Sequence, residues 1–185
     1  EIVGFAALTH TLRASAVARL LNAYLSTMTQ VVFHHGGTID QFNSDEMMVI
    51  FGAPEQLKTS SQVHRALRCA LDMQLALSQL NQSRDGDGLE ALQIRIGIHH
   101  GPAVVGNFGS EQRLDYTAVG ESVQLARLIR RAAGAGQLLL PPAIADLLPE
   151  SLVNQAGSFE MVPGHAEHLY GVPANASELL NEEAA

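Results

Sequence analysis

The sequence predicts an α+β domain in which helices pack on one face of a mostly antiparallel sheet. Two observations support this prediction. Long stretches with apolar residues at three- and four-residue steps, which are typical of helices, alternate with short strand-like runs. Two pairs of these runs are joined by tight turns, which favours antiparallel neighbours. The order in the early part of the chain fits βαββαβ, the ferredoxin-like arrangement.

The composition is that of an ordinary globular chain. It has 185 residues, of which 46% are hydrophobic and 16% charged, enough for one substantial core. We expect one domain over residues 1–172 and an acidic tail or linker over residues 173–185. The net charge of −8 argues against a nucleic-acid partner, because binding to phosphates needs clustered basic residues.

The cellular setting is predicted from cysteine content and hydropathy. Cys69 is the single cysteine, so an internal disulfide is impossible and a reducing, cytoplasmic location is expected. No apolar run approaches the roughly 18 residues of a membrane span, so we expect no membrane contact within this segment. The opening residues 1–3 look like the end of a strand. We therefore expect a piece of a larger protein, which could be the cytoplasmic part of a membrane protein.

Two long helices are expected to frame the domain. The first covers about Ser15–His35, where Gly36-Gly37 ends it, and the second covers Val63–Asn81. Before them, Gly4 turns the N-terminal strand into a short helix. The other expected elements are strands at 38–42, 47–51, 92–98, 103–108, 115–119 and 137–140, a helix at 120–132, a short helix from 141, and two final strands ending near 172.

The stretch Gly37–Pro54 is expected to lie at the centre of any functional site. Its apolar run Met47–Phe51 predicts a strand buried on both faces, and the turn formers Asn43–Glu46 join this strand to its partner. The turn places Asp45 at the rim of the sheet. A carboxylate there is an oxygen ligand for a hard cation, although a solvated turn would carry the same residues.

Three segments of the chain together resemble one known family. They are Glu1-Ile-Val-Gly-Phe, HGGTIDQFNSDEMMVIFGAP and IRIGIHHGPAVVGNFGSEQRLDYTAVGESVQLA. In order and spacing they resemble the catalytic domain of class III adenylate and guanylate cyclases, from Glu1 to about Val172. The resemblance implies a nucleoside triphosphate, ATP or GTP, as substrate. It also implies a dimer, either a homodimer or a heterodimer with another cyclase domain, in which each active site draws residues from both domains.

The resemblance further implies catalysis with two divalent ions, Mg²⁺ or Mn²⁺. One ion lowers the pKa of the ribose 3′-hydroxyl, which attacks the α-phosphate, and the other holds the triphosphate while pyrophosphate leaves. Asp45 matches one of the family's two metal-binding aspartates, and Glu1 stands at the position of the other. Backbone N–H groups of Gly4, Phe5 and Ala6 could hold phosphates at the start of the short helix.

The other half of the site departs from the family pattern. Gln41 replaces a lysine that reads the base, and Thr117 stands at its partner position; both side chains still form hydrogen bonds. Gln124 replaces the transition-state asparagine, and Leu128 replaces an arginine that stabilises the α-phosphate. Arg113 is the remaining candidate for a triphosphate contact.

These departures leave two functions open. Arg127 adjoins Leu128, but one helical step turns a side chain by about 100°, so Arg127 faces another direction. Losing the family's asparagine and arginine, at positions 124 and 128, could together lower the rate by a factor of ~10⁴ or more. The first hypothesis is a nucleotide cyclase that is weak or degenerate as a homodimer. The second is a non-catalytic cyclase-homology module that acts as a regulatory, nucleotide-binding or heterodimer partner. A diguanylate cyclase also carries an acidic turn, but LDYTAVGESVQLA argues against it.

Overall fold

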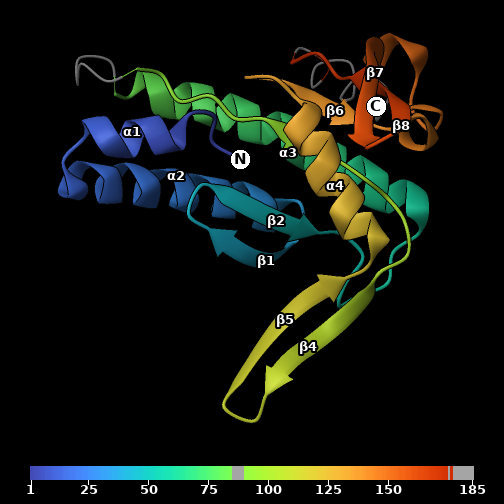
Figure 1. Cartoon of the computed structure of the whole chain (residues 1–185), viewed down its shortest axis with the longest axis horizontal. Helices are drawn as coiled ribbons and strands as arrows, with labels where there is room; N and C mark the ends of the chain where they lie inside the picture. Colours follow the sequence, from blue (N-terminus) through green and yellow to red (C-terminus); the bar gives the residue numbers. More distant parts are fainter. Residues whose placement is uncertain (85–89, 175, 177–185) are drawn as a thin grey trace.

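The computed structural model describes residues 1–84, 90–174 and 176, and it has the α+β architecture that the sequence predicts (Figure 1). Its helices are α1 (Phe5–Thr11), α2 (Ala14–His34), α3 (Thr59–Gln82), α4 (Glu121–Ala132) and α5 (Pro142–Ala145), with one 3₁₀ turn at Glu150–Leu152. Its strands are β1 (Thr38–Asn43), β2 (Glu46–Ile50), β3 (Ile96–Gly97), β4 (Val104–Ser110), β5 (Arg113–Val119), β6 (Leu138–Leu140), β7 (Asn154–Val162) and β8 (His165–Gly171).

Helices α2 and α3 lie side by side along the domain (Figure 1). On α2 the buried residues Leu20, Tyr24 and Met28 recur at four-residue steps, which places them on one face. They pack against Ile2 and Ile94 at the centre of the domain. This packing fixes the position of the N-terminal segment, which carries Glu1.

A second core cluster joins α3 to the C-terminal half of the chain. Its buried members are Val63, Leu67, Ala70, Leu71, Leu138, Leu140, Ile144, Ala145, Leu148, Leu152, Val172 and Ala176. Helix α3 begins at Thr59, earlier than the predicted Val63, so the polar connector is partly helical. Cys69, on the same helix, is buried as expected for a core residue, and burial raises the pKa of its thiol to about 12.

We expect Leu67→Ala to lower the free energy of unfolding by about 2–5 kcal/mol, because it leaves a cavity in this second cluster. Leu67 is 1% exposed, whereas Leu75, on the same helix, is 54% exposed. The matched Leu75→Ala variant should therefore cost less than about 1 kcal/mol. Urea denaturation of both variants checks the difference, and equal losses would contradict the packing described here.

The described strands form three separate hydrogen-bonded sheets. The largest has the order β3-β6-β8-β7, in which β3 and β6 are parallel and the other pairs antiparallel. Strands β1 and β2 form one antiparallel hairpin, and β4 and β5 form another. The second hairpin extends away from the rest of the domain (Figure 1).

The predicted strand at residues 92–98 contains only two residues in a regular ladder, β3. The segment is nevertheless paired on both sides. Its N–H groups at Ile96 and Ile98 donate to the carbonyls of Gln137 and Leu139, at 2.9 and 3.0 Å. On the other side, Ile2 forms an antiparallel bridge with Ile94. The N-terminal segment therefore lies beside residues 93–95, as its strand-like sequence suggested.

The prediction that Met47–Phe51 is buried on both faces is wrong. Every residue of β2 is only half-buried, because the strand borders a pocket. The turn before it is also shorter than expected, since Glu46 already belongs to β2. Asp40 forms a bulge in β1, because the register with β2 shifts between Ile39 and Gln41.

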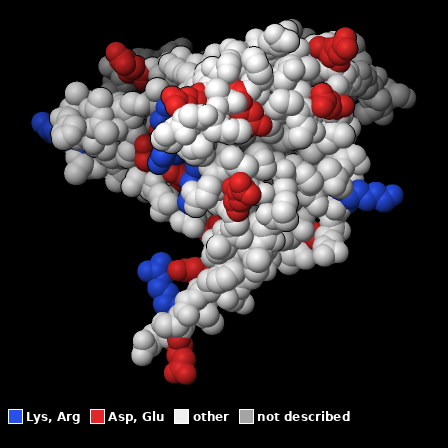
Figure 2. All heavy atoms as spheres, turned by 45° about the vertical axis from the view of Figure 1, so that its right-hand side comes forward, with Lys and Arg blue, Asp and Glu red and all other residues white. Residues whose placement is uncertain are grey.

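The visible surface carries acidic and basic side chains close together (Figure 2). Figure 2 shows basic side chains that are scattered or sit beside acidic ones, and on the described part of that face they form no continuous basic surface. None of the described helices is both long and apolar enough to cross a membrane. The predicted acidic tail, residues 173–185, lies outside the described residues apart from 173, 174 and 176.

Candidate active site

The candidate site is the rim where the N-terminal segment meets the β1–β2 turn. The N–H of Ile2 donates to the backbone carbonyl of Asp45 at 3.0 Å. On the other side of the segment, the N–H of Arg95 donates to the carbonyl of Glu1 at 3.0 Å, and that of Val3 donates to Gln93 at 2.8 Å. These bonds bring Glu1 and Asp45 together at one rim, although 44 positions separate them in the sequence.

Arginines surround the carboxylate of Glu1. Its Oε1 accepts hydrogen bonds from the guanidinium of Arg95, one of them at 3.1 Å from Nε, and its Oε2 contacts Nη1 of Arg130. The same Nη1 lies 3.2 Å from Oε2 of Glu46, whose Oε1 lies 3.4 Å from Nε of Arg127. One ion-pair network therefore ties the N-terminal segment, β2, the 93–98 segment and α4 together.

Arg130 is the residue at the centre of this network. Its side chain is 12% exposed, and its buried Nε has no hydrogen-bond partner among the residues that the structure describes. Burial, with a smaller contribution from the nearby charge of Arg131, lowers the pKa of Arg130. Burying a guanidinium whose donors are not all paired is unfavourable, because the lost hydration is not fully replaced. The contacts of Arg130 with the carboxylates must offset this cost.

Asp45 differs from Glu1 because its carboxylate takes part in none of the ion pairs or hydrogen bonds found among the described residues. It lies close enough to Tyr24 to affect that phenol: burial raises the pKa of Tyr24, and the charge of Asp45 adds to the shift. Asp45 is therefore the acidic group of the rim that remains available for a ligand.

The fit to a divalent cation can be tested on these side chains. Carboxylate oxygens are the ligands that Mg²⁺ and Mn²⁺ prefer. Both oxygens of Glu1 are, however, already paired with guanidiniums. Within residues 1–84 and 90–174, no group of three or more His, Cys, Asp or Glu side chains is placed to hold a metal. In the arrangement shown, the residues do not fit a metal ion.

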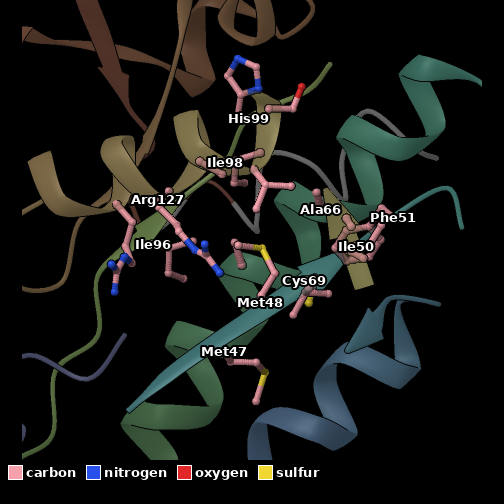
Figure 3. A pocket seen from close by; sticks show the side chains of 18 of the residues that line it. Met47, Met48, Ile50, Phe51, Ala66, Cys69, Ile96, Ile98, His99 and Arg127 are labelled. Atoms are coloured by element: carbon pink, nitrogen blue, oxygen red, sulfur yellow. The ribbon is translucent and has the colours of Figure 1, made fainter. Parts of the chain in front are cut away.

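A pocket of about 230 Å³ opens beside the rim. Figure 3 shows that its lining is largely apolar, with side chains from β2, α3 and residues 94–98, and Arg127 and His99 line it as well. Glu1, Glu46 and Arg130 also border it. An apolar cavity of this kind is not the place for a triphosphate, so the rim, rather than the pocket, is the candidate for phosphate chemistry.

The two predicted base contacts lie near each other but face different partners. The hydroxyl of Thr117 donates to Oδ2 of Asp40 at 2.8 Å, and the N–H of Ala118 donates to the same oxygen at 3.3 Å. Gln41 instead accepts a hydrogen bond from Asn43 at 3.2 Å. Sequence reasoning missed Asp40, because the bulge that turns it toward β5 is not visible in the residue pattern.

Helix α4 presents two different faces to its surroundings. Gln124 is exposed, and Leu128, one turn later, packs against a cluster that contains Ile129. Arg127 and Arg130, three residues apart, both point to the acidic rim of the same chain. The expectation that Arg127 faces another direction from Leu128 is therefore confirmed. The spacing of Arg127 and Arg130 could have indicated their shared target.

The remaining predicted residues lie in two places, the tip of the β4–β5 hairpin and the start of α1. Arg113 lies at the tip of the β4–β5 hairpin, where its Nε is 3.1 Å from Asp115 and its side chain is 82% exposed. Gly4 is the N-cap of α1 with φ of 72°, and open space adjoins its Cα. Phe5 is a core residue, so only its backbone, with that of Ala6, could contact phosphate.

Comparison with known proteins places this geometry in a family. The sequence model of the protein family described as adenylate and guanylate cyclase catalytic domain matches residues 1–172. The chain is 34% identical to adenylate cyclase 1 of Rhizobium meliloti over 126 residues, which are 68% of this chain and 19% of that protein. It is 30% identical to an adenylate cyclase of Anabaena cylindrica over 159 residues, 82% of this chain and 30% of that protein. The chain thus spans less than a third of these two relatives.

Solved structures agree with this assignment. The adenylyl cyclase CyaB from P. aeruginosa is 33% identical, with a TM-score of 0.86 over 94% of this chain and 90% of that one. A guanylyl cyclase is 35% identical, with a TM-score of 0.83 over 93% and 87%. A guanylyl cyclase domain from Blastocladiella emersonii, described as a non-canonical dimer, has the same fold at 19% identity and a TM-score of 0.77, over 93% and 91%. The chain belongs to the class III adenylate and guanylate cyclase catalytic domain family.

Proposed function

We propose that this domain converts ATP or GTP to the cyclic nucleotide and pyrophosphate, with low turnover as a homodimer. The observation that carries the proposal is the meeting of Glu1 and Asp45 at one rim of a cyclase fold. In the reaction, the ribose 3′-oxygen bonds to the α-phosphorus and loses its proton, while the bond to the bridging oxygen breaks. The family depends on divalent metal ions for this chemistry.

Low turnover follows from the residues on α4. The exposed Gln124 can still donate a hydrogen bond to a reacting nucleotide, but its amide lies one methylene further from the helix than that of asparagine. Leu128 offers no charge, and Arg127 and Arg130 point to the rim of their own chain. The helical position one turn after Gln124 therefore carries no arginine, and a homodimer repeats this at both sites.

Two divalent ions, Mg²⁺ or Mn²⁺, remain part of the proposal, with Asp45 and Glu1 as the residues that would hold them. Asp45 has the open carboxylate. Glu1 would have to leave at least one of its two arginines before it could bind a cation. Thr117 and Gln41 would then contact the base, with Thr117 held in place by its bond to Asp40.

A second copy of the chain is the proposed partner, and the β4–β5 hairpin is the proposed contact. Val104 and Val119 are direct cross-strand partners, so they lie on the same face, and Phe108 follows on that face. All three are exposed in the single chain. Thr117 belongs to the same face, which would place a predicted base contact next to the covering copy. These exposed apolar side chains, which lie beside the Arg113–Asp115 ion pair on the same face, support dimer formation.

We expect Phe108→Asp to weaken the dimer by about 2 kcal/mol or more, since it places a charge in the apolar contact. Analytical ultracentrifugation over a concentration series measures the effect. Phe33→Asp on α2 is the matched control, because Phe33 is 64% exposed and lies outside the hairpin. If both variants dimerise like the parent chain, the hairpin is not the dimer contact.

The second candidate function is a regulatory or heterodimer partner that does not turn over nucleotide alone. The arginine network favours it, because Glu1 is neutralised within its own chain. Incubation of the purified domain with ATP or GTP and Mn²⁺, followed by mass spectrometry of the products, separates the two functions. Cyclic nucleotide from the domain alone supports the first. Product that appears only after addition of a competent cyclase domain supports the second.

A further inference from the structure

We propose that Arg130 serves as a built-in counter-cation that keeps divalent metal from the acidic rim until its guanidinium withdraws. The inference rests on the proposed function, because it concerns the metal-binding step of the same site. Arg130 lies outside the three segments that resemble the cyclase family. The proposal follows from where the guanidinium lies, from the charges around it and from its incomplete hydrogen bonding.

The position of the guanidinium is that of a bridging cation. Its Nη1 contacts Oε2 of Glu1 and lies 3.2 Å from Oε2 of Glu46. These two carboxylates come from segments 45 positions apart, and one nitrogen links them. Arg95 already occupies Oε1 of Glu1, so a divalent ion would compete with the guanidinium of Arg130 for Oε2.

The charges of the rim are already balanced. Glu1, Asp45 and Glu46 contribute three negative charges, and the guanidiniums of Arg95, Arg127 and Arg130 contribute three positive ones. A divalent ion would therefore enter a group with no net negative charge to attract it. If one guanidinium withdraws, the carboxylates of the rim carry a net negative charge and attract a divalent cation. This attraction is strong because the charges are close together at a partly buried site.

Arg130 is the arginine whose withdrawal frees the rim most completely. Among the described residues Arg127 forms an ion pair with Glu46 alone, and Arg95 belongs to a segment that is hydrogen-bonded to Glu1 through its backbone. Arg130 alone of the three reaches both carboxylates. Its buried Nε finds no hydrogen-bond acceptor in the described part of the chain, so movement into solvent would also satisfy that donor.

The test is the affinity of the domain for Mn²⁺, measured by electron paramagnetic resonance without nucleotide. Arg130→Gln should bind Mn²⁺ about tenfold more tightly, or better, than the parent chain. Arg131→Gln removes the same charge from an exposed neighbour and should stay within about twofold. Adding Asp45→Asn to Arg130→Gln should abolish the gain, which locates the ion at the rim. Equal affinities for Arg130→Gln and the parent chain, or no binding by either, would overturn the proposal.

A crystal of the parent chain grown with Mn²⁺ gives a second test that requires no variant. The anomalous signal should place the ion at Glu1, with the guanidinium of Arg130 turned away from that carboxylate. An ion at Glu1 with Arg130 still in contact would overturn the proposal. The outcomes are separable from those of the proposed function. If Arg130→Gln binds Mn²⁺ more tightly but no assay detects turnover, the proposed cyclase activity is wrong and the role of Arg130 stands. If the domain turns over nucleotide but Arg130→Gln binds Mn²⁺ no more tightly than the parent chain, the cyclase activity stands and the role of Arg130 is wrong.

Discussion

Leu128→Arg combined with Gln124→Asn should raise cyclase turnover by ~10²-fold or more, because the pair restores two donors to charge that develops in the transition state. The two positions lie one turn apart on α4, so both new side chains would point the same way. Neither Arg127 nor Arg130 provides this donor, because both are engaged with the acidic rim. Initial rates of cyclic nucleotide formation with Mn²⁺ measure the effect.

The two single variants and a charge control test whether a gain in turnover comes from positions 124 and 128 acting together. Each single substitution should raise turnover by less than the pair does, because the effects of groups that act together on one transition state are not additive. Leu128 packs against the Ile129 cluster, so the arginine variant should also lose some stability. Leu147→Arg makes the same substitution at an exposed residue on another segment and should leave turnover unchanged. An inactive double variant that still binds nucleotide and Mn²⁺ would show that these positions do not limit the reaction.

Asp45→Asn should lower turnover by ~10²-fold or more, because it removes the open carboxylate of the rim while keeping its shape. The fold should survive, since the Ile2 N–H bonds to the backbone carbonyl of residue 45 and not to its side chain. Steady-state rates and a thermal unfolding curve for the same sample distinguish lost chemistry from lost structure. Asp146→Asn, at an exposed position after α5, is the matched control and should change neither quantity. A variant at position 45 that keeps full turnover would exclude Asp45 from the site.

Much of the fold could be predicted from the sequence because local patterns determine it. The four-residue spacing of Leu20, Tyr24 and Met28 predicts the buried face of α2, and the Asn43–Glu46 turn formers predict the first hairpin. The burial of β2 could not be predicted in this way. An apolar run shows that a strand avoids water, but not that a pocket would take the place of a packing neighbour on one side.

The site was predictable only in part for the same reason. The resemblance to the cyclase family pairs Glu1 with Asp45, and the hydrogen bond from the N–H of Ile2 to the carbonyl of Asp45 brings their segments together. The pairing of Arg130 with Glu1 joins residues 129 positions apart and appears only after α4 has packed beside the rim. The bond between Asp40 and Thr117 depends on a bulge, which changes the face on which one residue lies.

The most direct test of the account is a crystal structure of the domain with Mn²⁺ and a non-hydrolysable nucleoside triphosphate. The account predicts two copies of the chain, with the triphosphate above Glu1 and Asp45 of one copy and facing Gln124 on α4 of the other. Nucleotide bound within a single chain, or bound in a dimer away from Glu1 and Asp45, would contradict it.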